Sequence, residues 1–202
     1  FRDKFEALPG DNTIFGSTGV TVDGSIEDDG GAILEFTGEM PRFWEDLGKS
    51  GIRSGDGADY TGTGGAVVLG GNVPTANAGD DCGIVPYGVG GINFYNIANY
   101  LASTATATAN AGCLTPIDVF SIDTKMDDGI SDSGNVEASV GTALVGTNNT
   151  GGTSDYTHTA NACVGAVTAG DPDDPGAYDV NEDAALECQV RIRMGSVTGV
   201  LE

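Results

Sequence analysis

Ile122-Asp123-Thr124-Lys125-Met126-Asp127-Asp128-Gly129-Ile130-Ser131-Asp132-Ser133-Gly134 is the stretch that decides the fold of this chain. A helix begins before it at Thr115-Pro116, because Thr caps helices and Pro suits the first helical position. The Asp127-Asp128-Gly129 triplet ends that helix. Beyond the stretch, Val136, Ala138 and Val140 alternate with other residues as in a strand. The stretch therefore predicts a helix, a charged turn and the start of a strand.

Two helices are predicted nearer the N-terminus. Residues 1–8 have the pattern of the last turns of an amphipathic helix that begins before the chain does, and Pro9 stops it. The second helix begins at Pro41 and ends at Gly48 or Gly51. Trp44, the only Trp, lies in this helix and is expected to anchor the core.

Strand patterns are clearest near the C-terminus. Apolar residues alternate with polar and charged ones from Leu186 to Met194, which predicts a sheet with one apolar and one charged face. A short strand is expected at Ala66–Leu69. Phe94 and Ile97 lie on one face at helical spacing, so a short helix is expected between Gly91 and Leu101. No internal repeat is present, and residues 1–202 are expected to form one domain.

The composition excludes several classes of function. The chain has 202 residues, enough for one domain with its own core, and its 33 Gly indicate long surface loops. It carries 30 acidic residues against 8 basic ones, a formal net charge of −22. Nucleic-acid binding is excluded because it needs clustered Lys and Arg, and an anionic membrane surface would repel the domain. Salt or divalent cations would relieve the self-repulsion of such a chain.

The four cysteines indicate an exported protein. Cys82, Cys113, Cys163 and Cys188 include no Cys-x-x-Cys pair, which argues against zinc. An even number in an acidic, Gly-rich chain favours two disulfides. Three pairings are open, and we favour Cys82–Cys113 with Cys163–Cys188, because each pair brackets one acidic or Gly-rich loop.

Two acidic clusters are candidates for calcium, which takes six to eight oxygen ligands. These clusters are Asp23, Glu27, Asp28 and Asp29, and Asp123, Asp127, Asp128 and Asp132. Neither has the EF-hand spacing. The alternative for the second cluster is a turn at Asp128-Gly129, with Asp123 pairing Lys125 or capping a backbone group.

Catalysis has little support in the sequence. His158 is the only His, and no nucleophile motif such as Gly-x-Ser-x-Gly surrounds the nearby Ser154 and Asp155. Acidic pairs are expected by chance in a chain of this charge, and none stands out as a hydrolase pair. The chain is therefore expected not to be an enzyme, and no cofactor is required.

Three segments, in order, resemble a family of type IV pilin-like proteins. Residues 1–11 fit the family's aromatic-x-Asp-Lys-Phe-x-Ala-Leu-Pro-Gly-Asp segment, and residues 39–51 fit its Glu-x-x-x-Phe-Trp-x-x-Leu-x-x-x-Gly helix. The stretch from Ile122 to Gly134 fits its Ile-Asp-x-Lys-x-Asp-Asp-Gly-x-x-x-x-Gly signature, and Cys188 fits a late Cys in the last strand. The Cys82–Cys113 region and the long Gly/Thr loops have no counterpart in that pattern.

The resemblance implies an α+β pilin-like globular domain. In such proteins the C-terminal part of a long N-terminal helix packs on an antiparallel sheet, with extra short helices and Gly-rich loops. The hydrophobic first part of that helix is missing from this sequence. Residues 1–8 would be the end of it.

The implied function is that of a structural filament subunit. The filament would be an extracellular type IV pilus or the periplasmic pseudopilus of a type II secretion system, which the sequence does not separate. The implied partners are other copies of the chain, other pilins or pseudopilins, and, for a precursor in the inner membrane, the assembly platform and the prepilin peptidase. The alternatives are a secreted calcium-dependent binding or adhesion module and an acidic secreted hydrolase.

Overall fold

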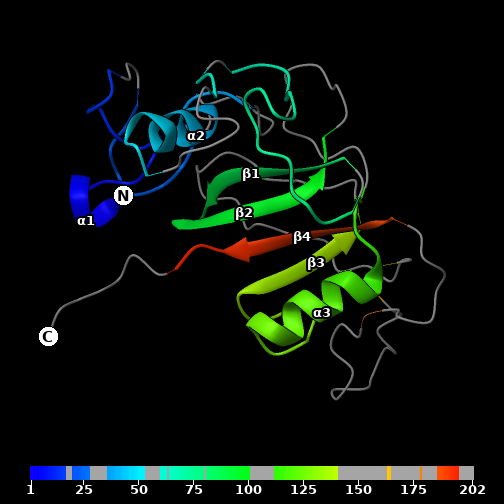
Figure 1. Ribbon diagram of the computed structural model, residues 1–202. Helices are drawn as coiled ribbons and strands as arrows, with labels where there is room; N and C mark the ends of the chain where they lie inside the picture. Colours follow the sequence, from blue (N-terminus) through cyan, green and yellow to red (C-terminus); the bar gives the residue numbers. More distant parts are fainter. Residues whose placement is uncertain are drawn as a thin grey trace, which may run out of the picture.

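The computed structural model describes residues 1–16, 20–27, 36–52, 60–62, 64–79, 81–100, 112–140, 163–164, 178 and 186–195. Within these residues, four antiparallel strands form one sheet in the order β1-β2-β4-β3 (Figure 1). The strands are β1 (Cys82–Val89), β2 (Ile92–Asn99), β3 (Val136–Val140) and β4 (Cys188–Arg193). The strands β3 and β4 occur in the parts of the chain where the sequence predicts strands. In the sheet, β4 is an inner strand and β3 forms one edge.

The hairpin of β1 and β2 corrects the prediction of a helix between Gly91 and Leu101. Gly90 and Gly91 connect the two strands with φ values of 59° and 76°. Positive φ at both turn residues is the geometry that fits the twist of a hairpin, and Gly adopts it without steric cost. The expected strand at Ala66–Leu69 is also wrong, because only Leu69 there makes a β-bridge, to Val73.

Three helices accompany the sheet: α1 (Arg2–Phe5), α2 (Met40–Lys49) and α3 (Pro116–Met126). Thr115 caps α3 in a reciprocal capping box with Asp118, as its sequence predicts. The helix α2 packs against β1, and α3 packs against β3 and β4, so the two lie toward opposite edges of the sheet (Figure 1). The fold is therefore mixed α+β.

The short helix α1 differs from the expected helix over residues 1–8. It ends at Phe5, because Glu6 takes a left-handed φ of 54°. It packs against none of the described strands. Instead, Phe1 and Phe5 cluster with Phe15, with ring centroids 4.6 to 6.0 Å apart. In the described residues, the packing of this helix on the sheet is not observed.

Two apolar clusters make the core. One joins α2 to β1 and β2, and Trp44 anchors it, as expected, by donating its indole N–H to the carbonyl of Ile84 at 3.1 Å. The other lies between α3, β3 and β4 and contains all four cysteines. Ile84 contacts both clusters, so the two halves of the sheet share packing.

The polar face of β4 is buried, although the alternation in its sequence predicts an exposed charged face. Gln189 and Arg191 lie on this face and are both buried. Arg191 forms an ion pair with Glu137 of β3 and lies over the Phe94 ring, 4.7 Å from its centroid. Asn96 of β2 contributes to the same face and donates to the Tyr100 hydroxyl at 2.7 Å. Arg191 can therefore be buried in the sheet because its charge is paired with that of Glu137.

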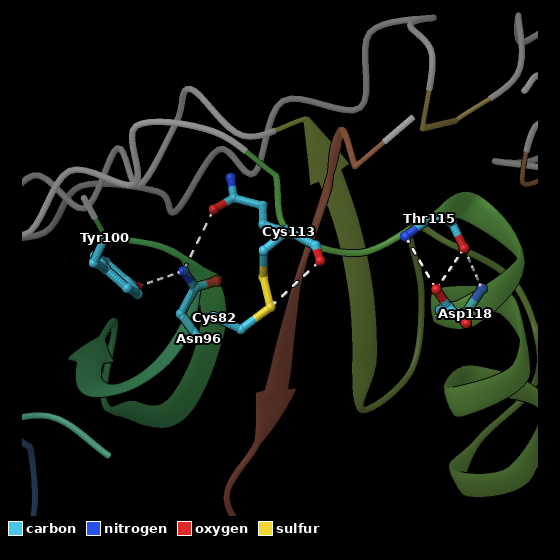
Figure 2. The surroundings of a disulfide bond; sticks show 7 residues. Cys82, Asn96, Tyr100, Cys113, Thr115 and Asp118 are labelled. Atoms are coloured by element: carbon cyan, nitrogen blue, oxygen red, sulfur yellow. Dashed lines mark hydrogen bonds between the residues drawn. A yellow bond between two sulfur atoms is a disulfide. The ribbon is translucent and has the colours of Figure 1, made fainter. Parts of the chain in front are cut away.

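The disulfides Cys82–Cys113 and Cys163–Cys188 are the pairs expected from the sequence. Both meet at one place, because the Cys113 N–H donates to the Cys188 carbonyl and the Cys188 N–H donates to Leu114. Figure 2 shows Cys113 between its disulfide partner and the Thr115 cap of α3. Each bridge contributes about 3–4 kcal/mol by restricting the unfolded chain. The first disulfide fixes the start of α3 to the edge strand β1, the second fixes Cys163 to β4, and the backbone hydrogen bonds hold the start of α3 beside β4.

Candidate functional site

The stretch from Ile122 to Gly134 forms the junction between α3 and β3. The helix ends where the Asp127 N–H makes its last helical bond, to the Asp123 carbonyl. Gly129 and Gly134 both have a φ of +78°, which reverses the chain twice in a short span. We call this segment the acidic turn.

Asp123 is the buried centre of the acidic turn. Its carboxylate accepts a hydrogen bond from the Tyr178 hydroxyl at 2.7 Å and another from the Gly129 N–H at 3.2 Å. Burial raises the pKa of Asp123, and these two bonds counteract part of that rise. The nearby Asp127 and Asp128 raise it further by charge repulsion. Asp123 therefore ties α3 both to the turn and to Tyr178, which lies 55 residues further along the chain.

Asp127 and Asp128 satisfy backbone donors on the far side of the turn. Asp127 accepts from the backbone N–H groups of Asn135 and Val136, where β3 begins. Asp128 accepts from the Ile130 N–H at 2.9 Å and from the Ser133 hydroxyl at 2.8 Å. These bonds satisfy backbone N–H groups that have no partner in a helix or a β-ladder.

The acidic turn also brings together three of the four acids in the second predicted calcium cluster. Asp123, Asp127 and Asp128 each place a carboxylate oxygen within 4.8 Å of the others, whereas Asp132 is not part of this group. Calcium takes six to eight oxygens, so a cation here would need several further ligands. The hydrogen bonds already made by the three carboxylates would compete with it.

The other predicted calcium cluster does not form a metal-binding group within the described residues. Asp23 and Glu27 are described but are not brought together with a third acid, and Asp28 and Asp29 lie outside the described residues. The backbone N–H of Asp23 donates to Asp11, and that of Glu27 donates to Glu39. This segment thus supplies donors to two other acids.

Those bonds belong to a second site, the N-terminal junction, formed by Asp11, Glu39 and Asp46 with the backbone of residues 10–16 and 20–27. Asp46 accepts from the Gly10 N–H at 2.8 Å and from the Asn12 amide at 2.7 Å. Asp11 also accepts from Gly24 at 2.7 Å, and Glu39 from Thr21 at 3.1 Å. The junction joins the first two segments of the family resemblance, residues 1–11 and 39–51.

Burial dominates the electrostatics of the N-terminal junction. The three carboxyl-bearing residues are only 0% to 4% exposed. Burial raises the pKa of Glu39 to about 8, and the neighbouring Asp11 and Glu27 add charge repulsion. Burial also raises the pKa of Asp11 and of Asp46. Glu39 therefore holds a proton near neutral pH, which an ordinary Glu does not.

Sequence reasoning missed Asp11, Asp46 and Tyr178 as residues that hold the structure. Asp11 and Asp46 lie inside the segments that resemble the pilin-like family, but a pattern does not show that an acid will be buried. Tyr178 gave no signal, because its partner Asp123 is far away in sequence. The only His, His158, lies outside the described residues.

Comparison of the chain with family models, curated proteins and solved structures finds no match. The resemblance to type IV pilin-like proteins therefore stays a prediction from the sequence. In the part of the chain that the structure describes, no helix has the length and apolar character needed to cross a membrane.

Gly134→Ala should destabilise the acidic turn. A Cβ at Gly134 would overlap the Asp127 carboxylate, which could move only by losing its bonds to the start of β3. The free energy of unfolding should fall by about 1–2 kcal/mol because of the left-handed φ, and by about 1–3 kcal/mol more because of the lost hydrogen bonds. Gly91→Ala is the matched control, with a φ of 76° and open space around the new Cβ. Equal losses for the two variants in urea unfolding would contradict this role of Gly134.

Gly10→Ala should disrupt the N-terminal junction. The new Cβ would lie 2.5 Å from the Glu39 carbonyl oxygen and 3.2 Å from the Phe43 nitrogen, which are backbone atoms bonded to each other in α2. Overpacking adds about 1–3 kcal/mol to the cost of the left-handed φ. Gly16→Ala, with a φ of +85° and no neighbour within 4 Å, measures the cost of φ alone. A Gly10 variant no less stable than the Gly16 variant would show that this contact does not constrain the fold.

Proposed function

We propose that this chain is the globular domain of a type IV pilin-like subunit of a filament, either a pilus or a secretion pseudopilus. The observation that carries the proposal is that the residues of the resemblance work together in two junctions. Gly10 and Asp11 lie against the start of the α2 helix at Glu39, and the signature's Asp123 and Asp127 join α3 to β3. A chance match of three separate patterns would not require their defined residues to hold the domain together.

The role of the domain in this proposal is structural. Assembly would bury the apolar surface of an N-terminal helix, as the resemblance implies, and the described domain would cover the filament. Its own residues hold the chain in place: Asp46 and Glu39 fasten residues 10–12 and 20–27 to α2, and the Cys82–Cys113 disulfide fastens the start of α3 to β1. No catalytic step is assigned to the subunit.

The intact mass and N-terminal sequence of the native protein from its source cells test this function. We expect an N-methylated Phe followed by an apolar run of roughly 20 residues upstream of Phe1, long enough to span a bilayer. Electron microscopy of the cell surface and of the periplasm would then separate a pilus from a pseudopilus. A native protein that begins near Phe1, or after a conventional signal peptide, would remove the assembly mechanism.

One observation favours the alternative, a secreted calcium-dependent binding module. This observation is the approach of Asp123, Asp127 and Asp128 within 4.8 Å of one another. The existing hydrogen bonds of Asp127 and Asp128 weigh against it, because calcium would have to displace them. The filament proposal is therefore preferred.

Thermal unfolding in calcium, compared with magnesium at equal concentration, separates the two candidates. A ligand that binds only the folded state at 100 times its Kd stabilises by about 2.7 kcal/mol. We expect calcium to raise the unfolding temperature no more than magnesium does, because general screening of a −22 chain acts with either ion. A calcium-specific rise that Asp128→Asn abolishes and Asp132→Asn preserves would favour the binding module instead.

A further inference from the structure

The N-terminal junction holds three buried carboxyls with very little compensating charge. Asp11 is 1% exposed, Glu39 is 4% exposed and Asp46 is fully buried. Within the described residues none of them forms an ion pair. Lys49, which is paired with Glu45 on the surface of α2, acts only weakly on Asp46. Burial of a carboxylate without a cation is costly, and the usual outcome is that the group takes up a proton.

The charged groups that face these carboxyls from the packed segments are mostly acids. Asp23 faces Asp11, and Glu27 and Asp11 face Glu39. Glu45 repels Asp46, while Lys49 attracts it. Ionisation of the whole group would therefore concentrate negative charge in one buried place.

An unpartnered oxygen provides a second, independent observation. The Oδ2 atom of Asp46 accepts from Gly10 and Asn12, but its Oδ1 atom is buried and has no hydrogen-bond partner. A buried ionised oxygen without a donor is more expensive than a neutral one. The burial of the three carboxyls and the unpartnered Asp46 oxygen both favour the neutral form of a carboxyl in this junction.

We propose that the N-terminal junction is a proton-controlled clasp, in which protonated Glu39, buried beside Asp11, holds residues 20–27 at the start of α2 and its deprotonation loosens them. The inference goes beyond the filament function and does not depend on it. The clasp would act in the domain alone, wherever that domain is found.

The direction of the pH dependence follows from the burial of Glu39. When the clasp is closed, burial raises the pKa of Glu39 from its ordinary value of 4.5 to about 8, although the backbone N–H groups of Glu27 and Thr21 oppose that rise. In the open clasp the carboxyl meets water, and its pKa returns toward the ordinary value. The closed form therefore binds more protons over this interval, so closing is strongest at acidic pH and weakens as the pH rises through about 8.

Hydrogen exchange measured by mass spectrometry on the whole chain tests the clasp. Peptides that contain Gly10, Thr21, Gly24 and Glu27 report opening, because their amides donate to the three carboxyls. We expect the protection factors, corrected for the intrinsic pH dependence of exchange, to fall at least about tenfold from pH 6 to pH 9, since one pKa unit is a tenfold effect. Peptides from α3 and β3 serve as the internal reference and should change less.

Two variants identify the group that is responsible. Glu39→Gln keeps the shape but cannot ionise, so the fall in protection between pH 6 and pH 9 should shrink severalfold. Glu187→Gln makes the same change at an exposed acid next to β4, which does not act on the three carboxyls of the junction, and should preserve the fall. An equal fall in the wild type and in Glu39→Gln, or no fall in the wild type, would overturn the proposal.

A direct titration keeps the test decisive if Glu39→Gln fails to fold. The carbon chemical shift of the Glu39 side-chain carboxyl, followed by NMR in the wild-type chain, should titrate well above the ordinary range of Glu. A midpoint near 4.5 would show that Glu39 is already ionised at neutral pH and would refute the clasp.

Discussion

Side-chain carboxyl groups that accept hydrogen bonds from backbone N–H groups are the interaction on which the described segments outside helices and strands depend. A segment outside helices and strands must still satisfy its buried donors, because each unpaired one costs as much as a lost hydrogen bond. Asp11, Glu39 and Asp127 each accept from two such donors. A carboxylate has about four acceptor sites, so one acid can replace two bonds of a ladder. A chain with 33 Gly and few strands needs this kind of support.

The cost of that support depends on where each acid lies. Glu39 is the N-cap residue of α2, where the helix dipole favours a negative charge, yet burial outweighs this effect and raises its pKa. Asp123 and Asp127 lie at the C-terminal end of α3, where the dipole opposes a negative charge. Asp127 remains partly exposed there, while Asp123 depends on the Tyr178 hydroxyl. The same residue type is therefore stabilised by solvent in one position and by a specific donor in the other.

Much of the regular structure could be predicted because its signals are local. The cap and proline of α3, the proline of α2 and the alternation in β3 and β4 each act within a few residues. Both disulfide pairs could also be predicted, because each pair brackets one acidic or Gly-rich loop. The hairpin was missed because Phe94 and Ile97 fit helical spacing, and the Gly90-Gly91 turn signal was given too little weight. The packing of a helix over residues 1–8 on the sheet was inferred from the resemblance, and α1 instead packs on Phe15.

The site residues were harder to predict, because their burial depends on partners far along the chain. Asp123 was singled out by its place in the signature, but as a calcium candidate or a capping residue; its bond to Tyr178 could not be anticipated. Asp11 and Asp46 are ordinary acids in the sequence and become buried only when residues 8–12 meet α2. For Arg191 the error was the opposite one. The alternation of apolar and charged residues along β4 suggested that its side chain is exposed, but the side chain is buried and paired with Glu137.

The two ends of the domain are consequently held by different physical means. Around α3, two fully buried disulfides fix the chain covalently, and backbone hydrogen bonds between Cys113 and Cys188 add to them; none of these bonds involves a titratable side chain. At the N-terminal junction, hydrogen bonds to titratable carboxyls do the holding, so the strength of attachment follows the proton concentration. The segment over residues 20–27, which is held by hydrogen bonds to Glu39, can therefore detach without unfolding the core. The core stays intact because Phe43 and Trp44 keep α2 packed against Tyr95 of the sheet. The covalent half then provides the fixed frame against which the N-terminal segment can move.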